Sequence, residues 1–384
     1  MKIVVAGGDG YIGWPLSLKL AKDNPTAEII IIDNCLKRQL IKNQGTESVV
    51  PILSLKDRVE EAIKEDSFKN LSFRNIDVTT AELAKFMANE RPNIFYHLAQ
   101  IPSAPYSMAN VDGAVHTLIN NEVGNTRLVW AIRKYCPECH IIKLGSFGEY
   151  FAEELDIAEG YFCPSYKGKQ STVPVPYPRR ADDVYHITKI NDSNILAMAS
   201  SQWNLKVTEI MQATIFGLGT EETLLKESLS NRFDCDPNFG TVVNRFVAQA
   251  VLEKELTIYG TGNQRTGLMY LGDAVDSLAS LVNLKCTFGE HKIINHLSEK
   301  DYCINEIADI VIESATEFGL NIVAKHGDNP RAENVLLKKV YEIETSYEKS
   351  STPMKKAIFE MIKIAEHNKD RISPEFVRVG KTWF

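Results

Sequence analysis

The stretch that decides the fold runs from Lys2 to Gly13 and reads KIVVAGGDGYIG. Its first five residues form a short apolar run typical of a buried strand, and a helix pattern follows the glycines. Gly7, Gly10 and Gly13 have G-x-x-G-x-x-G spacing. The first glycine permits a tight turn, the second lets backbone amides approach a diphosphate, and the third lets helix and strand pack closely. The stretch therefore predicts a strand, turn and helix that bind a dinucleotide.

An acidic residue at the end of the next apolar run indicates which dinucleotide is bound. Asp33 lies 20 residues after Gly13, where a carboxylate accepts hydrogen bonds from ribose hydroxyls and repels a 2′-phosphate. Lys37 and Arg38 argue the other way, because basic residues could hold that phosphate. Giving the acid more weight, we expect NAD rather than NADP. The expected contacts are Gly7, Gly10, Tyr11, Ile12, Gly13, Asp33, Asn34, Arg38, Asp77, Val78, Tyr185, Lys189 and Ile215.

Short apolar runs alternate with helix patterns through the first half of the chain, at Ile29 to Ile32, Ile94 to Leu98 and His140 to Leu144. This alternation predicts an α/β fold with a doubly wound parallel Rossmann sheet. We expect a nucleotide-binding domain over 1–212, to which segments near 240–285 return, and a smaller C-terminal substrate-binding domain over 213–384. Two stretches, Leu36 to Phe68 and Phe151 to Asp182, are longer than ordinary connections, and such insertions are usually functional or disordered.

Composition excludes several classes of protein. The 384 residues carry a formal net charge of −7, which argues against a nucleic-acid-binding protein. The chain contains no run of 18 apolar residues, so we expect no membrane span. The first strand is expected to begin at Lys2, which would leave no room for a targeting peptide. Seven scattered cysteines suit a reducing compartment. We therefore expect a cytoplasmic protein, prokaryotic rather than plastid, that binds no nucleic acid, membrane or metal.

A second motif carries the chemistry. Tyr185 and Lys189 share one face of a predicted helix, so the ammonium group and a cationic nicotinamide would lower the pKa of the phenol. The tyrosine can then act as a base near neutral pH. Ser146 follows the apolar run His140 to Leu144, and its hydroxyl can bond the same substrate oxygen. Cys136 to His140 spells a haem-attachment string, but it lies between a predicted helix and a buried strand, so we expect it to be structural.

These motifs resemble the extended short-chain dehydrogenases that act on nucleotide sugars, and several segments resemble the UDP-sulfoquinovose synthase family in particular. The resemblance runs from Met1 to Trp383 and includes parts of both insertions. The matching segments are Gly7 to Tyr11, Glu47-Ser48, Pro51, Asp57-Arg58, Ser103 to Met108, Lys143 to Gly145, Gly148 to Tyr150, Glu159 to Tyr161, Tyr177-Pro178, Tyr185-His186, Phe239 to Thr241, Asn244 to Phe246 and Asn329 to Arg331.

The resemblance implies a reaction in which sulfite and UDP-glucose give UDP-sulfoquinovose through 4-keto and 4-keto-5-ene intermediates, with NAD regenerated. Tyr185 would accept the 4-hydroxyl proton. Sugar dehydratases of this superfamily carry an Asp-Glu pair where this chain has Phe147 and Gly148. The groups for dehydration must therefore come from elsewhere, and Glu149 and His186 are the nearest candidates. A helix histidine bonded to a backbone carbonyl is an equally good interpretation of His186.

The resemblance also implies a nucleotide-sugar site and partners. Its expected residues are Ser103, Ser146, Tyr185, Gln212, Thr241, Val242, Val243, Asn244, Thr257, Ile258, Tyr259, Arg265, Arg331 and Glu333. Two positions depart from relatives, Pro102 in place of an arginine and Gln264-Arg265-Thr266 in place of Gln-Thr-Arg, and both bear on phosphate or sulfite contact. The helices near Val115 to Lys134 and Asp182 to Ser200 carry apolar residues on more than one face. Extended relatives pair these helices across a two-fold axis, so the resemblance implies a homodimer. A protein that donates the sulfur is a further possible partner.

Three other functions remain open. A UDP-glucose 4-epimerase shares the cofactor loop and the Tyr185–Lys189 pair but needs neither insertion. A sugar 4,6-dehydratase is disfavoured by Phe147 and Gly148. A non-catalytic NAD-sensing regulator would tend to lose Tyr185 and Lys189, which this chain retains.

Overall fold

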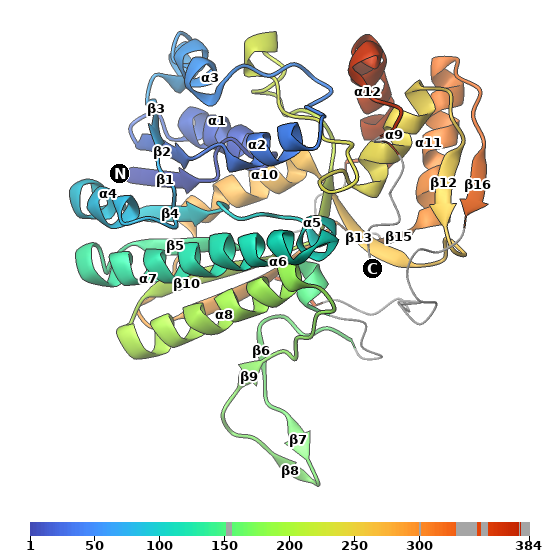
Figure 1. The fold of residues 1–384 in the computed structure, drawn as a ribbon. Helices are drawn as coiled ribbons and strands as arrows, with labels where there is room; N and C mark the ends of the chain where they lie inside the picture. The colour runs from blue at the N-terminus through green and yellow to red at the C-terminus, as the bar shows by residue number, and fades with distance from the viewer. Residues whose placement is uncertain (151–155, 299–300, 328–343, 347–351, 376, 378–384) are drawn as a thin grey trace.

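The computed structural model describes residues 1–150, 156–298, 301–327, 344–346, 352–375 and 377, and its centre is a parallel sheet (Figure 1). All six strand pairs of this sheet are parallel. The seven strands lie in the order β3 (Leu71–Asn75), β2 (Glu28–Asp33), β1 (Lys2–Ala6), β4 (Ile94–His97), β5 (His140–Leu144), β10 (Lys206–Gln212) and β14 (His291–His296). The expected doubly wound sheet is confirmed.

Helices cover both faces of the sheet, because each face is a continuous apolar surface that must be buried. On one face α1 (Gly13–Asp23), α3 (Leu55–Ala62) and α10 (Leu271–Ser280) pack around Trp14. On the other face lie α4 (Glu82–Glu90), α7 (Gly124–Tyr135) and α8 (Val184–Trp203). The strand order reverses between β1 and β4, and ligands of such sheets bind at the carboxyl ends of the strands at that point.

The glycines of the first turn are required by close backbone contact. Gly7 has a φ of +88°, and a Cβ there would lie 2.6 Å from the carbonyl of Leu98. A Cβ on Gly13 would lie 2.1 Å from the Gly7 oxygen. Neither contact is possible for another residue without moving the backbone. The absence of side chains at these two positions therefore lets the turn pack closely against Leu98 and against the start of α1.

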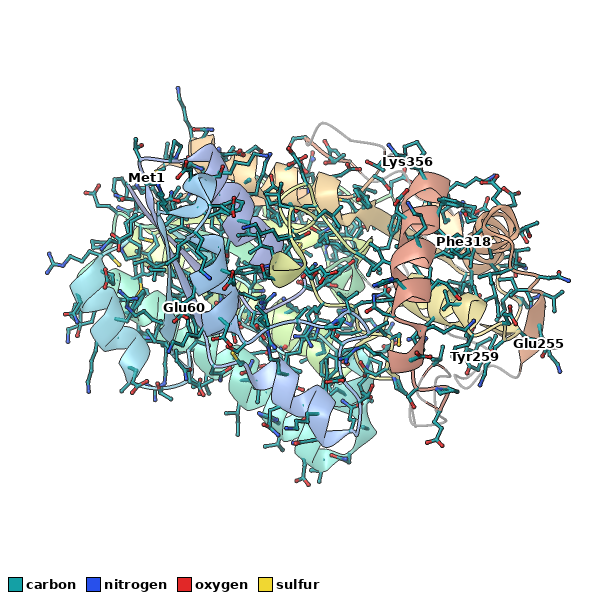
Figure 2. All side chains as sticks on the ribbon, turned by 90° about the horizontal axis from the view of Figure 1, so that it is seen from above. Met1, Glu60, Glu255, Tyr259, Phe318 and Lys356 are labelled. Atoms are coloured by element: carbon teal, nitrogen blue, oxygen red, sulfur yellow. The ribbon has the colours of Figure 1, made fainter. Side chains whose placement is uncertain are left out.

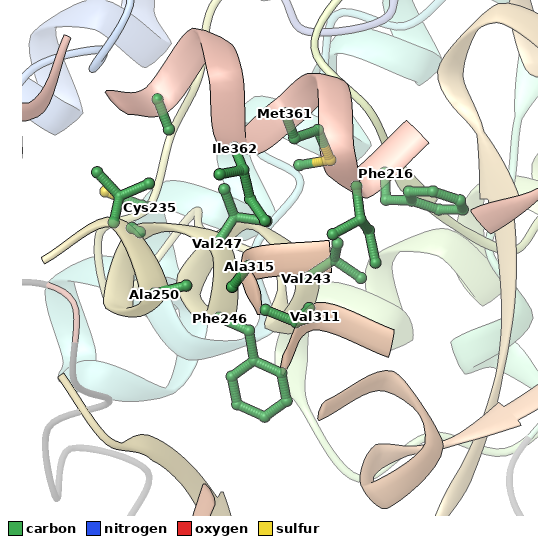
Figure 3. Close-up of a cluster of buried hydrophobic side chains, with 14 of the residues drawn as sticks. Phe216, Cys235, Val243, Phe246, Val247, Ala250, Val311, Ala315, Met361 and Ile362 are labelled. Atoms are coloured by element: carbon green, nitrogen blue, oxygen red, sulfur yellow. The ribbon is translucent and has the colours of Figure 1, made fainter. Parts of the chain in front are cut away.

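The C-terminal part has its own hydrophobic core, built by α9 (Val242–Val251), α11 (Ile304–Phe318) and α12 (Met354–His367) (Figure 3). Two short sheets flank these helices: β11 (Thr214–Phe216), β13 (Arg265–Tyr270) and β15 (Asp301–Cys303), and then β12 (Leu256–Tyr259) with β16 (Ala324–Gly327). Figure 2 shows Met1 and Glu60 at one end of the molecule and Glu255 and Phe318 at the other. Because α10 packs on α1 and β14 joins the central sheet, the chain returns to the first core after residue 212. The division at residue 212 stays a prediction.

Both long insertions contain regular structure. The first forms α2 (Leu36–Asn43), α3 and the 3-10 turn Asp66–Phe68. The second forms two short ribbons, β6 (Tyr161–Phe162) with β9 (Val175–Pro176) and β7 (Ser165–Tyr166) with β8 (Lys169–Gln170), which project from the body below α8 (Figure 1). Among the described residues, no helix is long and apolar enough to cross a lipid bilayer.

Candidate active site

A pocket of about 510 Å³ lies at the carboxyl ends of the central strands, where the sheet order predicts ligand binding. Most residues that the sequence nominated for the cofactor and the chemistry line it. They are Gly7, Gly10, Tyr11, Ile12, Gly13, Asp33, Asn34, Val78, Ser103, Ser146, Tyr185, His186, Lys189, Gln212, Thr241, Val242 and Ile215. Segments that are far apart in sequence are thus brought to one cavity.

Asp33 lies at the end of β2 and lines the pocket. Its carboxylate accepts hydrogen bonds from the backbone amides of Asp9 at 2.8 Å and Cys35 at 2.6 Å. Burial, together with the negative charge of Asp9, raises the pKa of Asp33 to about 6. The carboxylate has further lone pairs for ribose hydroxyls, and their donation would stabilise the ionised form.

The basic residues near Asp33 are held by other carboxylates. Arg38 donates two hydrogen bonds to Asp9, at 2.6 and 2.7 Å, and does not line the pocket. Lys37 pairs with Asp234 at 2.7 Å. A 2′-phosphate would have to compete with these ion pairs, which favours the interpretation of the site as specific for NAD.

Asp9, in the middle of the glycine turn, is the centre of a buried charge network. Besides Arg38 it pairs with Arg58 at 2.5 Å, and Arg58 is fully buried with its guanidinium 4.4 Å from the Trp14 ring. Arg232 also approaches Asp9, at 3.9 Å. Since Arg38 and Arg58 both come from the first insertion, this insertion holds the cofactor turn in place.

A loop that sequence reasoning did not nominate closes one side of the pocket. Asn238, Phe239 and Gly240 line the cavity. Ser103 donates a hydrogen bond to the carbonyl oxygen of Asn238, and the Tyr106 ring stacks on Phe239 at 5.9 Å. Residues 231–240 are rich in Asn, Pro and Gly, a composition typical of loops, but nothing in it indicates which side of the molecule the loop reaches.

The Tyr185–Lys189 pair lies on α8, facing the pocket. The Lys189 ammonium donates to the Leu144 carbonyl oxygen at 2.6 Å and lies 5.6 Å from the centre of the Tyr185 ring. Burial, with the positive charge of Lys143 next in importance, lowers the pKa of Lys189 to about 7. In the chain alone burial raises the pKa of Tyr185, while a hydrogen bond with Ser146 acts to lower it. The lowering expected from Lys189 alone is therefore outweighed by burial, and a cationic nicotinamide would have to supply the remaining positive potential.

His186 lies beside Ser146 in this pocket. Its Nε2 is 3.2 Å from the Ser146 hydroxyl, and its Nδ1 is 2.6 Å from a carboxylate oxygen of Asp183. The expected alternative, a bond to a backbone carbonyl, is therefore wrong. A Cβ on Gly148 would lie 2.0 Å from His186 Nε2, so only glycine leaves room for the ring. The imidazole of His186 therefore occupies the space that a side chain at position 148 would fill.

Glu149 is fully buried and does not line the pocket. One of its oxygens accepts a hydrogen bond from the Ser146 amide at 2.9 Å, and the other pairs with Arg179 at 2.9 Å. Ser146 and Glu149 form a capping box around the turn Phe147–Glu149. The carboxylate thus lies behind the pocket wall, beneath Ser146.

Several other nominated residues do not line the pocket. Val243 and Ile258 are core residues of the C-terminal part, as Figure 3 shows for Val243. Asn244 is also buried, and its amide donates to the Asp234 carbonyl oxygen at 3.0 Å. Arg265 pairs with Asp301 at 2.7 Å. Thr257 and Tyr259 lie on β12, away from the cavity.

Asp77, expected to contact the cofactor, does not line the pocket either. β3 ends at Asn75, so Asp77 lies in the following turn, where its carboxylate accepts from the amide and hydroxyl of Thr79, both at 2.7 Å. Arg331 and Glu333 lie outside the described residues. Within the described part of the chain, no group of three or more His, Cys, Asp or Glu residues could hold a metal ion.

Comparison with known proteins identifies the family. The model of the NAD dependent epimerase/dehydratase family matches residues 3–295. A UDP-sulfoquinovose synthase of Sulfolobus acidocaldarius is 38% identical over 335 residues, which are 87% of this chain and 84% of that protein. The chain belongs to the UDP-sulfoquinovose synthase family. A chloroplastic UDP-sulfoquinovose synthase of Spinacia oleracea, 33% identical over 86% of this chain and 68% of its own length, agrees.

Solved structures show the same fold as this UDP-sulfoquinovose synthase family member. A UDP-glucose 4-epimerase of Thermotoga maritima superposes with a TM-score of 0.67 at 18% identity, covering 96% of this chain and 99% of that chain. A UDP-glucuronic acid 4-epimerase of Bacillus cereus superposes equally well, at 16% identity. The chain is an NAD-dependent enzyme of the epimerase/dehydratase family, and the glycine turn, Asp33 and the pocket fit that cofactor.

Proposed function

We propose that this enzyme joins sulfite to UDP-glucose and releases UDP-sulfoquinovose and water. The 4-hydroxyl of the glucose is oxidised, the ketone acidifies the hydrogen on carbon 5, and water leaves from carbon 6. Sulfite then adds to carbon 6 of the enone, carbon 5 takes a proton, and the 4-ketone is reduced again. NAD, held by the glycine turn and Asp33, would supply the hydride acceptor for the first step and the hydride donor for the last. Because it is regenerated, we propose that it stays bound through turnover.

Tyr185, Lys189 and Ser146 serve the oxidation and the final reduction. The phenolic oxygen accepts the proton of the 4-hydroxyl, and Ser146 orients the same hydroxyl by a hydrogen bond. Lys189, whose ammonium is fixed on the Leu144 carbonyl oxygen, stabilises the phenolate. A general base of this kind contributes about a hundredfold to ten-thousandfold in rate.

The position of His186 carries the proposal for the middle of the reaction. Asp183 orients the ring through Nδ1, so Nε2 is directed toward Ser146 and the pocket. An imidazole there can take the carbon-5 proton or protonate the leaving hydroxyl. A 4-epimerase needs no such group, and a 4,6-dehydratase would have an acid at position 148, where the His186 ring now lies.

The nucleotide half of the substrate would lie toward the C-terminal part. Gln212, Thr241 and Val242 line that side of the pocket, and Gln212 is 2.6 Å from His296. Arg331 and Glu333 remain proposals for the diphosphate and the sugar. An arginine there would bind phosphate oxygens through its planar pair of donors.

We also propose that the enzyme is a cytoplasmic homodimer. All seven cysteines are free thiols, which suits a reducing compartment. Val111, Val115 and Ile119 expose apolar side chains at four-residue intervals along α6 (Val111–Leu118) and into the π-helix Ile119–Val123 that follows it. Ile187 and Met198 also expose apolar side chains on α8. Since α6 packs against α8, these residues suit a face buried against a second copy. The sulfur donor in the cell, free sulfite or a protein, stays open.

Incubation of the NAD-loaded enzyme with UDP-glucose, with and without sulfite, tests the proposal. We expect an absorbance of reduced cofactor to appear with UDP-glucose alone, and a sulfonated nucleotide sugar to form only when sulfite is present. Formation of UDP-galactose, or of a 4-keto-6-deoxy sugar as the end product, would assign the chain to one of the other reactions.

A further inference from the structure

The turn that carries Ser146 rests on a buried ion pair that joins it to the second insertion. Arg179 comes from the last residues of that insertion, and its side chain is only 6% exposed. Its Nη1 lies 2.9 Å from Glu149 Oε2. The other oxygen, Glu149 Oε1, accepts from the Ser146 amide at 2.9 Å. A continuous chain of charge-assisted contacts therefore runs from the insertion to the backbone of the residue that faces the substrate.

The surroundings leave Glu149 dependent on Arg179. Glu209, the other carboxylate near Arg179 Nη1 at 3.4 Å, has partners of its own. It accepts from Ser193 at 2.5 Å and pairs with Lys143 at 3.4 Å. Burial and the negative charge of Glu209 raise the pKa of Glu149, and Arg179 is the strongest influence in the opposite direction. Without the guanidinium, Glu149 would be a buried carboxylate beside another carboxylate.

The backbone of the insertion is docked at the same place. The Arg180 amide donates to the Glu149 carbonyl oxygen at 3.0 Å, and Tyr150 and Arg180 form a β-bridge. The Arg179 guanidinium also lies 5.9 Å from the Tyr150 ring. The end of the insertion is thus fixed to the turn by the backbone of Arg180, and the side chain of Arg179 adds the ion pair with Glu149.

We propose that Arg179 is a positioning residue for the oxidation step: it fixes the Glu149 carboxylate and through it the Ser146 hydroxyl. Glu149 accordingly supports the turn and transfers no proton to or from the substrate. The inference rests on the proposed oxidation of a UDP-sugar by Tyr185 and Ser146, and it is independent of the later addition of sulfite. A displacement of about 1 Å at such a hydroxyl can cost roughly a hundredfold in rate.

Substitution of the two partners, singly and together, separates positioning from proton transfer. Arg179→Met should slow the appearance of reduced cofactor after mixing with UDP-glucose by roughly tenfold to a hundredfold. Glu149→Gln should keep part of the rate, because the amide oxygen still accepts from the Ser146 amide, although the NH2 group then faces the Arg179 guanidinium as a second donor. The double variant should be faster than Arg179→Met, because no unpaired charge remains. Arg179→Lys should recover part of the rate, and Arg180→Met, at the exposed neighbouring side chain, should match the wild type.

A double variant slower than either single variant would contradict the proposal, and so would a Glu149→Gln enzyme without activity. Either result would indicate that Glu149 transfers a proton to or from the substrate. A normal rate per NAD-loaded molecule in Arg179→Met, with only a lower melting temperature, would make the ion pair merely structural. Crystal structures of Arg179→Met (or Arg179→Lys, should the first not fold) and of the double variant give a readout without substrate. We expect Ser146 Oγ to move out of hydrogen-bond range of His186 Nε2 in the single variant and to return in the double variant. If the wild type does not oxidise UDP-glucose, the proposed function fails. The distance from Ser146 Oγ to His186 Nε2, compared between the single and the double variant, still decides the role of Arg179.

Discussion

Tyr185 is the residue on which the proposed oxidation depends. Tyr185→Phe keeps the ring and its packing but removes the proton acceptor, so the rate of cofactor reduction should fall by about a hundredfold to ten-thousandfold. NAD content should not change, because the glycine turn and Asp33 lie elsewhere in the pocket. Stopped-flow absorbance checks the rate and chromatography of the released cofactor checks the content. Near-normal turnover in the variant would rule out the tyrosine as the base.

His186 should separate the first step from the later ones. His186→Asn removes the titratable ring while its shorter side chain still fits beside Gly148. We expect reduced cofactor to accumulate with UDP-glucose, while formation of sulfonated product falls by about a hundredfold or more, as for loss of a general acid or base. Absorbance and product analysis of the same sample give both values. Full product formation by the variant would exclude His186 from dehydration.

Asp33 should make the affinity for NAD depend on pH. Its pKa is raised to about 6, and ribose hydroxyls bind the ionised form, so affinity should be full above pH 6 and weaken as the pH falls below it. The dissociation constant should rise by up to roughly tenfold per pH unit below 6. Calorimetric titration of the cofactor-free protein from pH 5 to 8 measures this. Asp33→Asn is the control and should bind weakly and without that dependence; an equal dependence in the variant would point to another group.

The sequence predicted these residues because each belongs to a short motif with local spacing. The spacing of the glycines in Gly7 to Gly13 and of Tyr185 and Lys189 is recognisable in the sequence alone. His186 was found because it adjoins Tyr185. Arg179 was missed because it lies in an aperiodic insertion and meets Glu149 only after folding. Val243 and Ile258 were nominated by resemblance, but no local pattern indicates that their side chains point into the C-terminal core.

At the scale of elements, the first insertion is expected to retain the cofactor. Its helix α3 carries Arg58, which is buried against Trp14 and pairs with Asp9 of the glycine turn. Arg58→Met should lower the melting temperature and release NAD during gel filtration, because removing one partner of a buried pair costs about 3–5 kcal/mol and Arg38 compensates only in part. Lys56→Met, an exposed change on the same helix, is the matched control. Full NAD retention by Arg58→Met would show that the insertion is not needed to hold the cofactor.

The strands and helices themselves were largely predictable, and the long-range contacts were not. The alternation of apolar runs and helix patterns gave the parallel sheet, since buried strands and amphipathic helices have distinct periods. The return of β14 to the edge of the sheet and the position of residues 238–240 at the pocket depend on contacts between distant segments. Periodicity carries no information about such contacts.

For the whole molecule, the exposed apolar residues of α6, of the π-helix after it and of α8 predict a dimer. Ile119 is 51% exposed in the single chain, and Ile119→Arg should convert the dimer to a monomer at micromolar concentration. Leu225→Arg, at an apolar residue 57% exposed elsewhere on the surface, should leave the dimer intact. Light scattering coupled to gel filtration measures both. A monomeric wild type would contradict the proposed assembly.

The central claim is that one pocket removes the carbon-5 proton of a UDP-sugar, adds sulfite to carbon 6 and then protonates carbon 5 again. Mass spectrometry of the product formed from UDP-glucose and sulfite in heavy water tests this most directly, because carbon 5 must take its new hydrogen from the solvent. The account predicts a product heavier than UDP-glucose by one sulfite less one water, with a single non-exchangeable deuterium at carbon 5. A UDP-hexose of unchanged composition without deuterium would contradict it.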